Sequence, residues 1–289
     1  MKVAVISGKG GSGKSSVTAA WLSLSRHVVA VDCDVDASNL PLLFSHEVIA
    51  HEGFVSGEDI YVDTKRCIGC GICVETCAFQ ALEIGTEGFP VPRDFLCEGC
   101  GCCLRVCPQH ALSLVAEARS QIYTARLLRS DHHLVYGHLK PGDDNSGKMI
   151  ARMREVADAE MVAIGADLQL LDGPPGIGCP VLSTLTGMDR VVLVCEPTLS
   201  GFADLQRAYR VAASFCKALF VVINKCDINS DNAQQIRDFC ATYHLPVVAE
   251  LPFDRKMVEA QLNCCSLVDY APQSDGAEAL RKAYALVFQ

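Results

Sequence analysis

Short, nearly continuous apolar runs alternate with longer helical patterns along most of the chain. Such runs are typical of strands buried on both faces of a parallel sheet. We expect strands over residues 3–7, 27–32, 167–172, 190–196, 218–224 and 246–251. We expect helices over residues 14–25, 147–164, 202–216, 231–244 and 275–288. The pattern predicts an α/β fold with a doubly wound, mainly parallel sheet that carries helices on both faces.

The stretch from residue 60 to residue 115 interrupts this alternation. It is rich in cysteine and glycine and has no long helical period. Because the flanking halves need each other to complete one sheet, we predict a discontinuous α/β domain of residues 1–59 and 116–289. A small ferredoxin-like α+β domain of residues 60–115 would be inserted in it. Residues 129–147 are polar and turn-rich, which predicts a mobile loop.

Composition and charge narrow the class of protein. The chain of 289 residues has a formal net charge of -9, which does not favour sequence-independent nucleic-acid binding. The N-terminal apolar run is too short for a signal peptide, and there is no stretch of about 18 uncharged apolar residues. We therefore expect a cytoplasmic protein with no nucleic-acid partner and no integral membrane segment.

A glycine-rich loop follows the first predicted strand. Its sequence, Gly8-Lys9-Gly10-Gly11-Ser12-Gly13-Lys14-Ser15, matches the phosphate-binding pattern G-x-x-x-x-G-K-[ST]. Backbone N–H groups of such a loop surround phosphate oxygens, and the N-terminus of the next helix adds positive potential. We expect Lys14 to reach the β and γ phosphates and Ser15 to bind Mg²⁺, with Ser16 also at the nucleotide.

Acidic residues follow two of the predicted strands. Asp34 comes after the strand 27–32, between Asp32 and Asp36, and Asp172 ends the strand 167–172. Acids at the carboxyl ends of parallel strands lie beside the phosphate crevice. The sequence after Asp172, Gly173-Pro174-Pro175-Gly176, suits a loop with two discrete states. A helix cap is the alternative role of Asp172.

A further motif follows the strand 218–224. Asn224-Lys225-Cys226-Asp227 matches the N-K-x-D pattern that selects guanine in many GTPases. We expect Asn224, Lys225 and Asp227 to lie beside the nucleobase. Pro252 and Phe253 would line the same pocket.

Nine of the 17 cysteines lie between Cys67 and Cys107, and such clustering indicates metal binding. The spacing C-x₂-C-x₂-C-x₃-C occurs twice, as in bacterial ferredoxins with two [4Fe–4S] clusters. In that arrangement the fourth cysteine of each run binds the other cluster. The first predicted ligand set is Cys67, Cys70, Cys73 and Cys107. The second is Cys97, Cys100, Cys103 and Cys77.

Alternatives remain for these cysteines. Two zinc sites with four cysteines each would also use eight thiolates. Cys102 lies beside Cys103, so the ligand register of the second run could differ by one residue. Ala78 occupies the position after the first run where ferredoxins usually have a proline, which removes no ligand.

The early lysine of the loop, Lys9, makes it resemble the deviant Walker A class, the MinD, ParA and nitrogenase iron-protein group. The whole chain resembles MinD-superfamily P-loop ATPases with an inserted two-cluster ferredoxin domain. The resemblance implies that Lys9 acts across an ATP-dependent dimer, formed with a second copy or with a paralogue. It also implies that Asp34 orients the attacking water and the Mg²⁺ shell, and that Asp172 contacts the metal's water shell. The same group places Asn224 against adenine, so ATP is favoured over GTP.

The combined motifs predict an ATPase that couples nucleotide-driven dimer and switch changes to electron transfer through two [4Fe–4S] clusters. One alternative is an assembly factor or carrier that hands a cluster to a client protein. Another is a spatial organiser like MinD or ParA, in which the clusters are structural or sensory. The sequence identifies neither the client nor the redox partner. Cys179, seven residues after Asp172, leaves open a third cluster that bridges a dimer, as in the nitrogenase iron protein.

Overall fold

The computed structural model describes residues 1–93, 96–140 and 145–289. The described chain forms two compact units. The nucleotide unit consists of Met1–His51, Ile122–His138 and Gly147–Gln289. The cysteine unit consists of Glu52–Gln121 and Leu139–Ser146, and so extends on both sides of the predicted insert.

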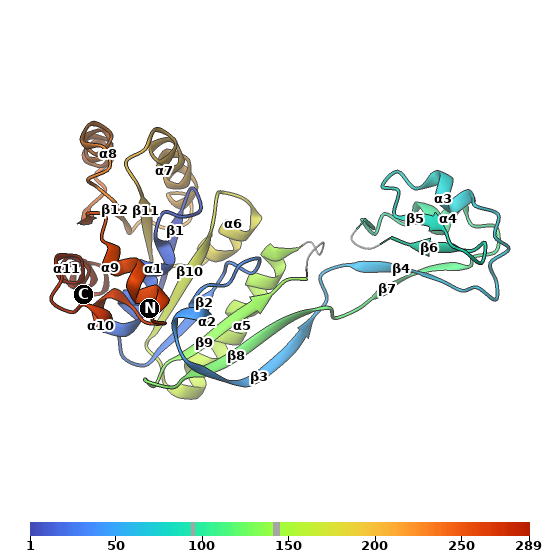
Figure 1. Ribbon diagram of the computed structural model, residues 1–289, viewed down its shortest axis with the longest axis horizontal. Coiled ribbons are helices and arrows are strands. Elements are labelled where there is room, and N and C mark those ends of the chain that lie inside the picture. The colour runs from blue at the N-terminus through green and yellow to red at the C-terminus, as the bar shows by residue number, and fades with distance from the viewer. Residues whose placement is uncertain (94–95, 141–144) are drawn as a thin grey trace. The chain divides into compact units, whose positions relative to one another are not determined.

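A nine-stranded, mainly parallel sheet forms the centre of the nucleotide unit (Figure 1). The strand order is β13-β12-β11-β1-β10-β2-β9-β8-β3, and every neighbouring pair from β13 to β9 is parallel. The strands are β1 (Lys2–Ser7), β2 (Val28–Asp32), β3 (His46–Phe54), β8 (Ser120–Leu127), β9 (His133–His138), β10 (Leu168–Pro175), β11 (Arg190–Cys195), β12 (Leu219–Asn224) and β13 (Val247–Leu251).

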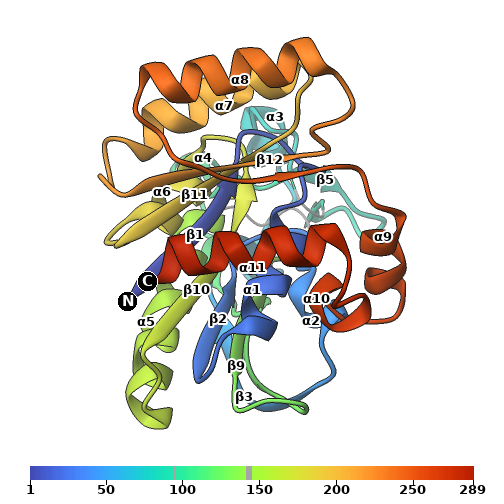
Figure 2. The same ribbon diagram turned by 90° about the vertical axis from the view of Figure 1, so that its left-hand side faces the viewer.

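Helices cover both faces of this sheet. They are α1 (Lys14–Leu24), α2 (Leu40–Leu43), α5 (Ser146–Ile164), α6 (Cys179–Leu185), α7 (Leu199–Ala212), α8 (Ser230–Thr242), α9 (Arg255–Leu262), α10 (Leu267–Tyr270) and α11 (Asp275–Phe288). Helices α1 and α11 lie side by side over one face (Figure 2), where they share a core with Val3 and Val28. On the other face, Gly137 of β9 lies against Met149 and Met153 of α5. The predicted fold class is confirmed.

The central strands form because their side chains are apolar on both sides. Val3–Ile6 of β1 and Val28–Val31 of β2 are completely buried. Trp21 links the covering helices, since its indole N–H donates to the carbonyl of Leu280 at 3.1 Å and its ring meets Phe288 edge to face. A buried tryptophan with a satisfied N–H contributes strongly to core stability.

The expectation of a mobile loop over residues 129–147 is wrong for its central part. Residues 133–138 form β9, which pairs in parallel with β2 from Val29↔His133 to Asp32↔Tyr136. His132 is buried and accepts the N–H of Val28 at 3.3 Å. The short apolar core of β9 is stabilised by this pairing, which local sequence does not reveal. Residues 141–144 lie outside the described residues.

The cysteine unit has two small antiparallel sheets and two short helices. The sheets pair β4 (Glu58–Val62) with β7 (Leu112–Ala116) and β5 (Leu82–Ile84) with β6 (Pro90–Pro92). The helices are α3 (Ile72–Thr76) and α4 (Cys102–Val106). A small apolar core consists of Ile60, Cys73, Leu82, Cys103 and Leu112.

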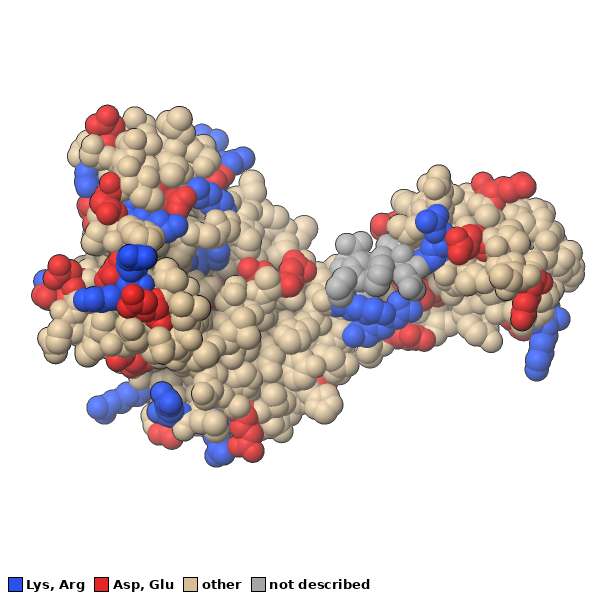
Figure 3. Space-filling model, viewed as in Figure 1, with Lys and Arg blue, Asp and Glu red and all other residues tan. Residues whose placement is uncertain are grey.

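Acidic and basic side chains are interspersed on the molecular face drawn in Figure 3. Within the described ranges, no helix is long and apolar enough to cross a membrane.

Candidate functional site

The glycine-rich loop joins β1 to α1, as its motif requires. Gly13 has a φ of 95° and lies so close to the Asn224 side chain that a Cβ atom would clash with it. The Asn224 amide, at the end of β12, donates to the carbonyl of Ser12 at 2.9 Å. This contact fixes the glycine-rich loop to β12. The Ser12 hydroxyl is buried and has no hydrogen-bond partner among the described residues.

Lys14 and three aspartates form a buried charged group at the carboxyl ends of β1, β2 and β10. Burial lowers the pKa of Lys14, although Asp172, Asp34 and Asp32 oppose this effect. Burial likewise raises the pKa of Asp172 to about 6, while hydrogen bonds from Ser15 and Thr18 act in the other direction. The Thr18 hydroxyl donates to Asp172 Oδ1 at 3.1 Å. The site therefore holds excess carboxylate where a divalent cation and phosphates could be bound.

Asp32 organises the loop that carries Asp34. Its carboxylate accepts the N–H groups of Asp34, Asn39 and Leu40 at 3.1, 2.8 and 2.9 Å. Burial raises the pKa of Asp32 well above its usual range. The same physical cause raises the pKa of the half-buried Asp34. Asp32 thus positions the loop, whereas Asp34 lines the open cavity.

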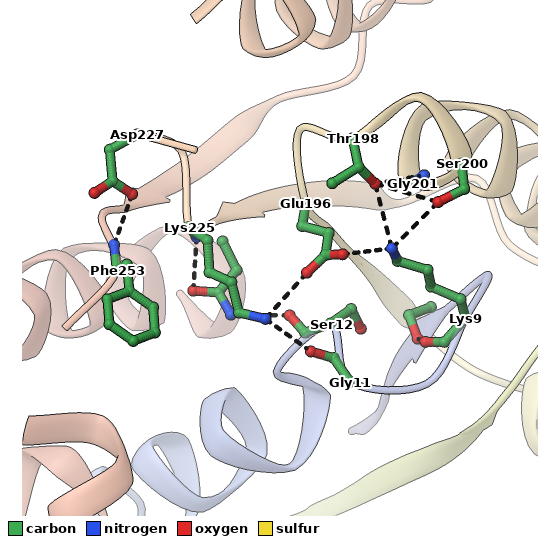
Figure 4. A network of polar contacts seen from close by, with 12 residues as sticks. Lys9, Gly11, Ser12, Glu196, Thr198, Ser200, Gly201, Lys225, Asp227 and Phe253 are labelled. Atoms are coloured by element: carbon green, nitrogen blue, oxygen red, sulfur yellow. Dashed lines mark hydrogen bonds and ion pairs between the residues drawn. The ribbon is translucent and has the colours of Figure 1, made fainter. Parts of the chain in front are cut away.

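A cavity of about 570 Å³ brings most of the predicted nucleotide residues together. This volume lies within the usual range for small-molecule sites. The predicted residues that line it are Gly10, Gly11, Gly13, Lys14, Ser15, Ser16, Asp34, Asn224, Lys225, Pro252 and Phe253. Gly8, Ser12, Asp172 and Asp227 do not line it. Asp227 instead accepts the N–H of Phe253 at 2.8 Å and so holds the Pro252–Phe253 loop (Figure 4).

Lys9 does not line the cavity, and its side chain points toward Glu196, directly after β11 (Figure 4). Its ammonium group forms an ion pair with Glu196 and donates to Thr198 at 3.2 Å and Ser200 at 3.4 Å. Lys225 contacts the other oxygen of Glu196 at 3.1 Å and the carbonyl of Gly11 at 3.2 Å. Burial acts to raise the pKa of Glu196, but the hydrogen bonds from the two lysines hold it below its usual value.

Sequence reasoning missed the role of Glu196 and of the hydroxyls after it. The signal was present, since Glu196 directly follows the apolar strand β11. Asp172, predicted at a strand end, lies inside β10, which continues to Pro175. What the sequence could not give was the direction of Lys9, because that depends on how β11 and α7 lie beside β1.

The cysteine unit contains two small cavities, and each is lined by cysteines from both runs. One cavity is lined by Cys67, Cys70, Cys73 and Cys107. The other is lined by Cys77, Cys97, Cys100, Cys102 and Cys103. Apart from Cys102, these are the two predicted ligand sets, including the exchange of the fourth cysteine between the runs.

Backbone N–H groups donate to the sulfurs in an equivalent way in both runs. Ala81 donates to Cys77 and Ala111 donates to Cys107, both at 3.3 Å. Gly69 and Gly99 make the corresponding contacts with the first cysteine of each run at 3.5 Å. Donors of this kind stabilise sulfur ligands that carry negative charge.

No metal site is preformed in the described part of the chain, the cysteine cavities included. It contains no group of three or more His, Cys, Asp or Glu side chains placed to hold a single metal ion. Cys179 is exposed at the start of α6. A third cluster on Cys179 stays a hypothesis.

A second cavity of the nucleotide unit, about 700 Å³, lies apart from the phosphate loop and shares no lining residue with the nucleotide cavity. It is lined in part by His132, Cys264 and Cys265. Because no predicted site residue lines it, we do not regard this larger cavity as the nucleotide site.

Comparison with known proteins identifies the family of the chain. The CobQ/CobB/MinD/ParA nucleotide binding domain matches residues 3–264. The uncharacterized protein MJ0578 of Methanocaldococcus jannaschii is 35% identical over 293 residues, which cover 98% of this chain and 95% of that protein.

Two solved structures share the fold. The cell division ATPase MinD of Pyrococcus furiosus superposes with a TM-score of 0.56 at 19% identity, covering 98% of this chain and 96% of the other. The septum site-determining protein MinD of Pyrococcus horikoshii, in complex with Mg-ADP, gives a TM-score of 0.58 at 18% identity and covers 100% and 96%. Together with the phosphate loop, the family match and the relative at 35% identity show that the chain belongs to the CobQ/CobB/MinD/ParA nucleotide-binding domain family.

Proposed function

We propose that this ATPase couples ATP-driven dimer and switch changes to electron transfer through two [4Fe–4S] clusters held by the cysteine unit. The observation that carries the proposal is the pairing of cysteines across the two cavities. Each cavity combines three predicted ligands of one run with the fourth of the other, and Cys102 also lines the second cavity. Two runs of this spacing that exchange their fourth cysteine are the hallmark of two-cluster ferredoxins.

The nucleotide cavity supports Mg²⁺ and ATP as ligands. Lys14 lines the cavity and would neutralise phosphate charge there. Ser15 and Asp34 would hold Mg²⁺ and its water shell, and the Ser15 hydroxyl donates to the Asp172 carboxylate. The Asp227 carboxylate accepts the backbone N–H of Phe253. Because this carboxylate is already occupied, the pocket favours adenine over guanine as the nucleobase.

Lys9 would act in a dimer. In the single chain it is held by Glu196, Thr198 and Ser200. We infer that ATP-dependent pairing, with a second copy or a paralogue, releases Lys9 toward the partner's nucleotide. There it would stabilise charge on the transferring phosphoryl group.

Two features of the cysteine cavities support the proposed clusters. Their sulfurs accept backbone N–H donors, and the apolar side chains of Ile60, Leu82 and Leu112 surround them. A [4Fe–4S] cluster supplies one-electron transfer at a potential that such surroundings adjust. In this proposal the chain's own residues bind the clusters, limit water and hold negative charge at the sulfurs.

The test is an EPR-monitored redox titration of anaerobically prepared protein, with and without MgATP. A shift of about 60 mV in a one-electron couple corresponds to a tenfold change in equilibrium and would support coupling. The Lys14→Ala variant should show no such shift, which separates nucleotide binding from an effect of Mg²⁺ alone. Intact clusters with the same potential in both conditions would contradict coupling.

A cluster carrier is the second candidate. Cys70 and Cys100 are exposed, so clusters bound there would be accessible to an acceptor protein. The discriminating measurement is transfer of iron to an apo-ferredoxin. Transfer that depends on MgATP would favour the carrier, and stable retention of iron would favour electron transfer.

A further inference from the structure

The second cavity of the nucleotide unit lies at the end of the sheet opposite to the phosphate loop. That loop follows the carboxyl end of β1, and β1, β10, β2 and β9 are parallel to one another. The cavity is lined by Arg26 and His27, directly before β2, and by Asp131 and His132, directly before β9. It is therefore a separate space of about 700 Å³, a volume usual for small-molecule sites.

Hydrogen bonds between distant segments fix the walls of this cavity. The ring of His132 accepts the N–H of Val28 at 3.3 Å, which joins the turn before β9 to the start of β2. The Ser23 hydroxyl donates to Asp269 at 2.7 Å, which joins α1 to α10. Because these walls are formed in the free protein, little ordering entropy would be lost when a ligand binds.

Two arginine side chains line the cavity without a partner. Arg26 lies between α1 and β2, and Arg129 lies between β8 and β9. Neither forms an ion pair or a side-chain hydrogen bond with any residue that the structure describes. A guanidinium group presents a planar fork of N–H donors that matches two oxygens of a carboxylate or phosphate group. The cavity thus offers charged donors that lack an acceptor.

Two aspartates also line the cavity, but one of them is already engaged. Asp269 Oδ2 accepts the hydroxyls of Ser23 and Ser266, both at 2.7 Å, and these donors offset its negative charge. Asp131 is exposed and forms no ion pair with either arginine. Burial lowers the pKa of His132, so its ring adds no positive charge at neutral pH. Two free guanidinium groups therefore face one free carboxylate, which leaves the lining positive.

The other side chains of the cavity favour an organic ligand over a metal ion. Phe44 and Leu127 contribute an apolar part of the wall. Cys264 and Cys265 also line it. Nevertheless, no three His, Cys, Asp or Glu side chains in the described ranges are placed to hold a metal ion. The lining thus combines an apolar wall with free cationic donors.

We propose that this cavity is a second ligand site, which binds a small organic oxyanion, either a carboxylate or a phosphate ester. Arg26 and Arg129 bind its charged group, and the apolar wall with Phe44 packs against its carbon skeleton. The site uses no residue of the nucleotide cavity and none of the cysteine unit. It can therefore be occupied together with the nucleotide.

The test is saturation-transfer-difference NMR on the full chain. The protein is first saturated with Mg²⁺ and a non-hydrolysable ATP analogue, so that the phosphate loop is occupied. Succinate represents the carboxylates, glycerol 3-phosphate represents the phosphate esters, and glycerol is the neutral control. A saturable signal from succinate alone would assign a carboxylate, and one from glycerol 3-phosphate alone a phosphate ester. Signals from both would support the shared oxyanion chemistry.

Substitutions at the exposed arginines should leave the fold intact and weaken binding. Arg26→Gln and Arg129→Gln should each lower the affinity at least ~10-fold, because a charge-assisted hydrogen bond is lost. Arg210→Gln, at an exposed arginine of α7 outside the cavity, is the matched control and should change nothing. Asp131→Asn removes a negative charge beside the anion and should strengthen binding about twofold. Damage to the fold could not produce this gain.

Three outcomes would overturn the inference. The first is the absence of a saturable signal from both anions. The second is an affinity that stays the same in Arg26→Gln and Arg129→Gln, or that falls equally in Arg210→Gln, because the anion would then respond to overall charge or bind elsewhere. The third is a glycerol signal as strong as those of the anions, which would show binding without recognition of charge.

Discussion

The phosphate site and the cysteine cavities are assembled in opposite ways. The phosphate site takes residues from the loop after β1, from the carboxyl ends of β2 and β10, and from segments as far along the chain as Phe253. The cysteine cavities take nearly all their polar groups from Cys67–Cys77 and Cys97–Cys107. One site depends on the whole sheet, and the other depends mainly on two short repeats.

The two sites also treat charge differently. The phosphate site holds three aspartates and Lys14 at a buried edge, where burial shifts the pKa values of Asp32 and Asp172 upward. The cysteine cavities leave Cys70 and Cys100 exposed and provide N–H donors to other sulfurs. We infer that the first site is arranged to gain stability from a cation and phosphates, and the second from a covalently held metal group.

The largest expected effect concerns Lys14. Replacing it with alanine should lower kcat for ATP hydrolysis at least ~10²-fold, because the group that neutralises phosphate charge is lost. Steady-state phosphate release is the measurement. Iron content should not change, because the cysteine cavities share no residue with the loop. Loss of iron in this variant would contradict the separation of the two sites.

The next effect concerns the exposed ligands. Cys70→Ala should reduce iron from about eight to about four per chain, because one cluster loses a thiolate. Iron and sulfide analysis together with EPR would measure this. Cys179→Ala, at another exposed cysteine, is the matched control and should keep the full iron content. If Cys179→Ala also lost iron, the third-cluster hypothesis would gain support and the two-cluster count would be wrong.

Asp172→Asn should stabilise the nucleotide-free protein. Because burial raises the pKa of Asp172 from 3.8 to about 6, the folded state binds this proton more tightly than the unfolded state. Its contribution to stability therefore falls as pH rises from about 4 to about 6. At pH 7 without Mg²⁺, the amide should raise the free energy of unfolding by up to ~3 kcal/mol.

Denaturant unfolding at several pH values would measure this effect. The exposed Asp131→Asn is the control for the same change in side chain. A lower stability of Asp172→Asn at pH 7 would mean that the hydrogen bonds from Ser15 and Thr18 outweigh the cost of burial.

The smallest effect concerns Glu196. Glu196→Gln weakens the contacts that hold Lys9 in its own chain, which frees it for a partner. ATP-dependent association should strengthen about tenfold, corresponding to ~1.4 kcal/mol. Light scattering with and without MgATP would detect it. Glu250→Gln, which alters the Arg237–Glu250 pair at 2.7 Å, is the matched control. Weaker association of Glu196→Gln would show that Glu196 supports the dimer instead.

Much of the sheet could be predicted from the sequence. Val3–Ile6 and Val28–Val31 are apolar without interruption, and no other element explains such runs flanked by glycine or polar residues. Strand β9 was missed because its apolar part is short and lies among polar residues. Pairing with β2, distant in the chain, makes it a strand.

The sequence by itself determined the phosphate loop, the buried central strands and the spacing of the eight predicted cluster ligands, because each is encoded by neighbouring residues. Only the tertiary structure decided that Lys9 is held by Glu196 and that Asp32 positions the loop of Asp34. The physical reason is that these contacts depend on the direction of side chains, which is set by the packing around them and not by spacing along the chain.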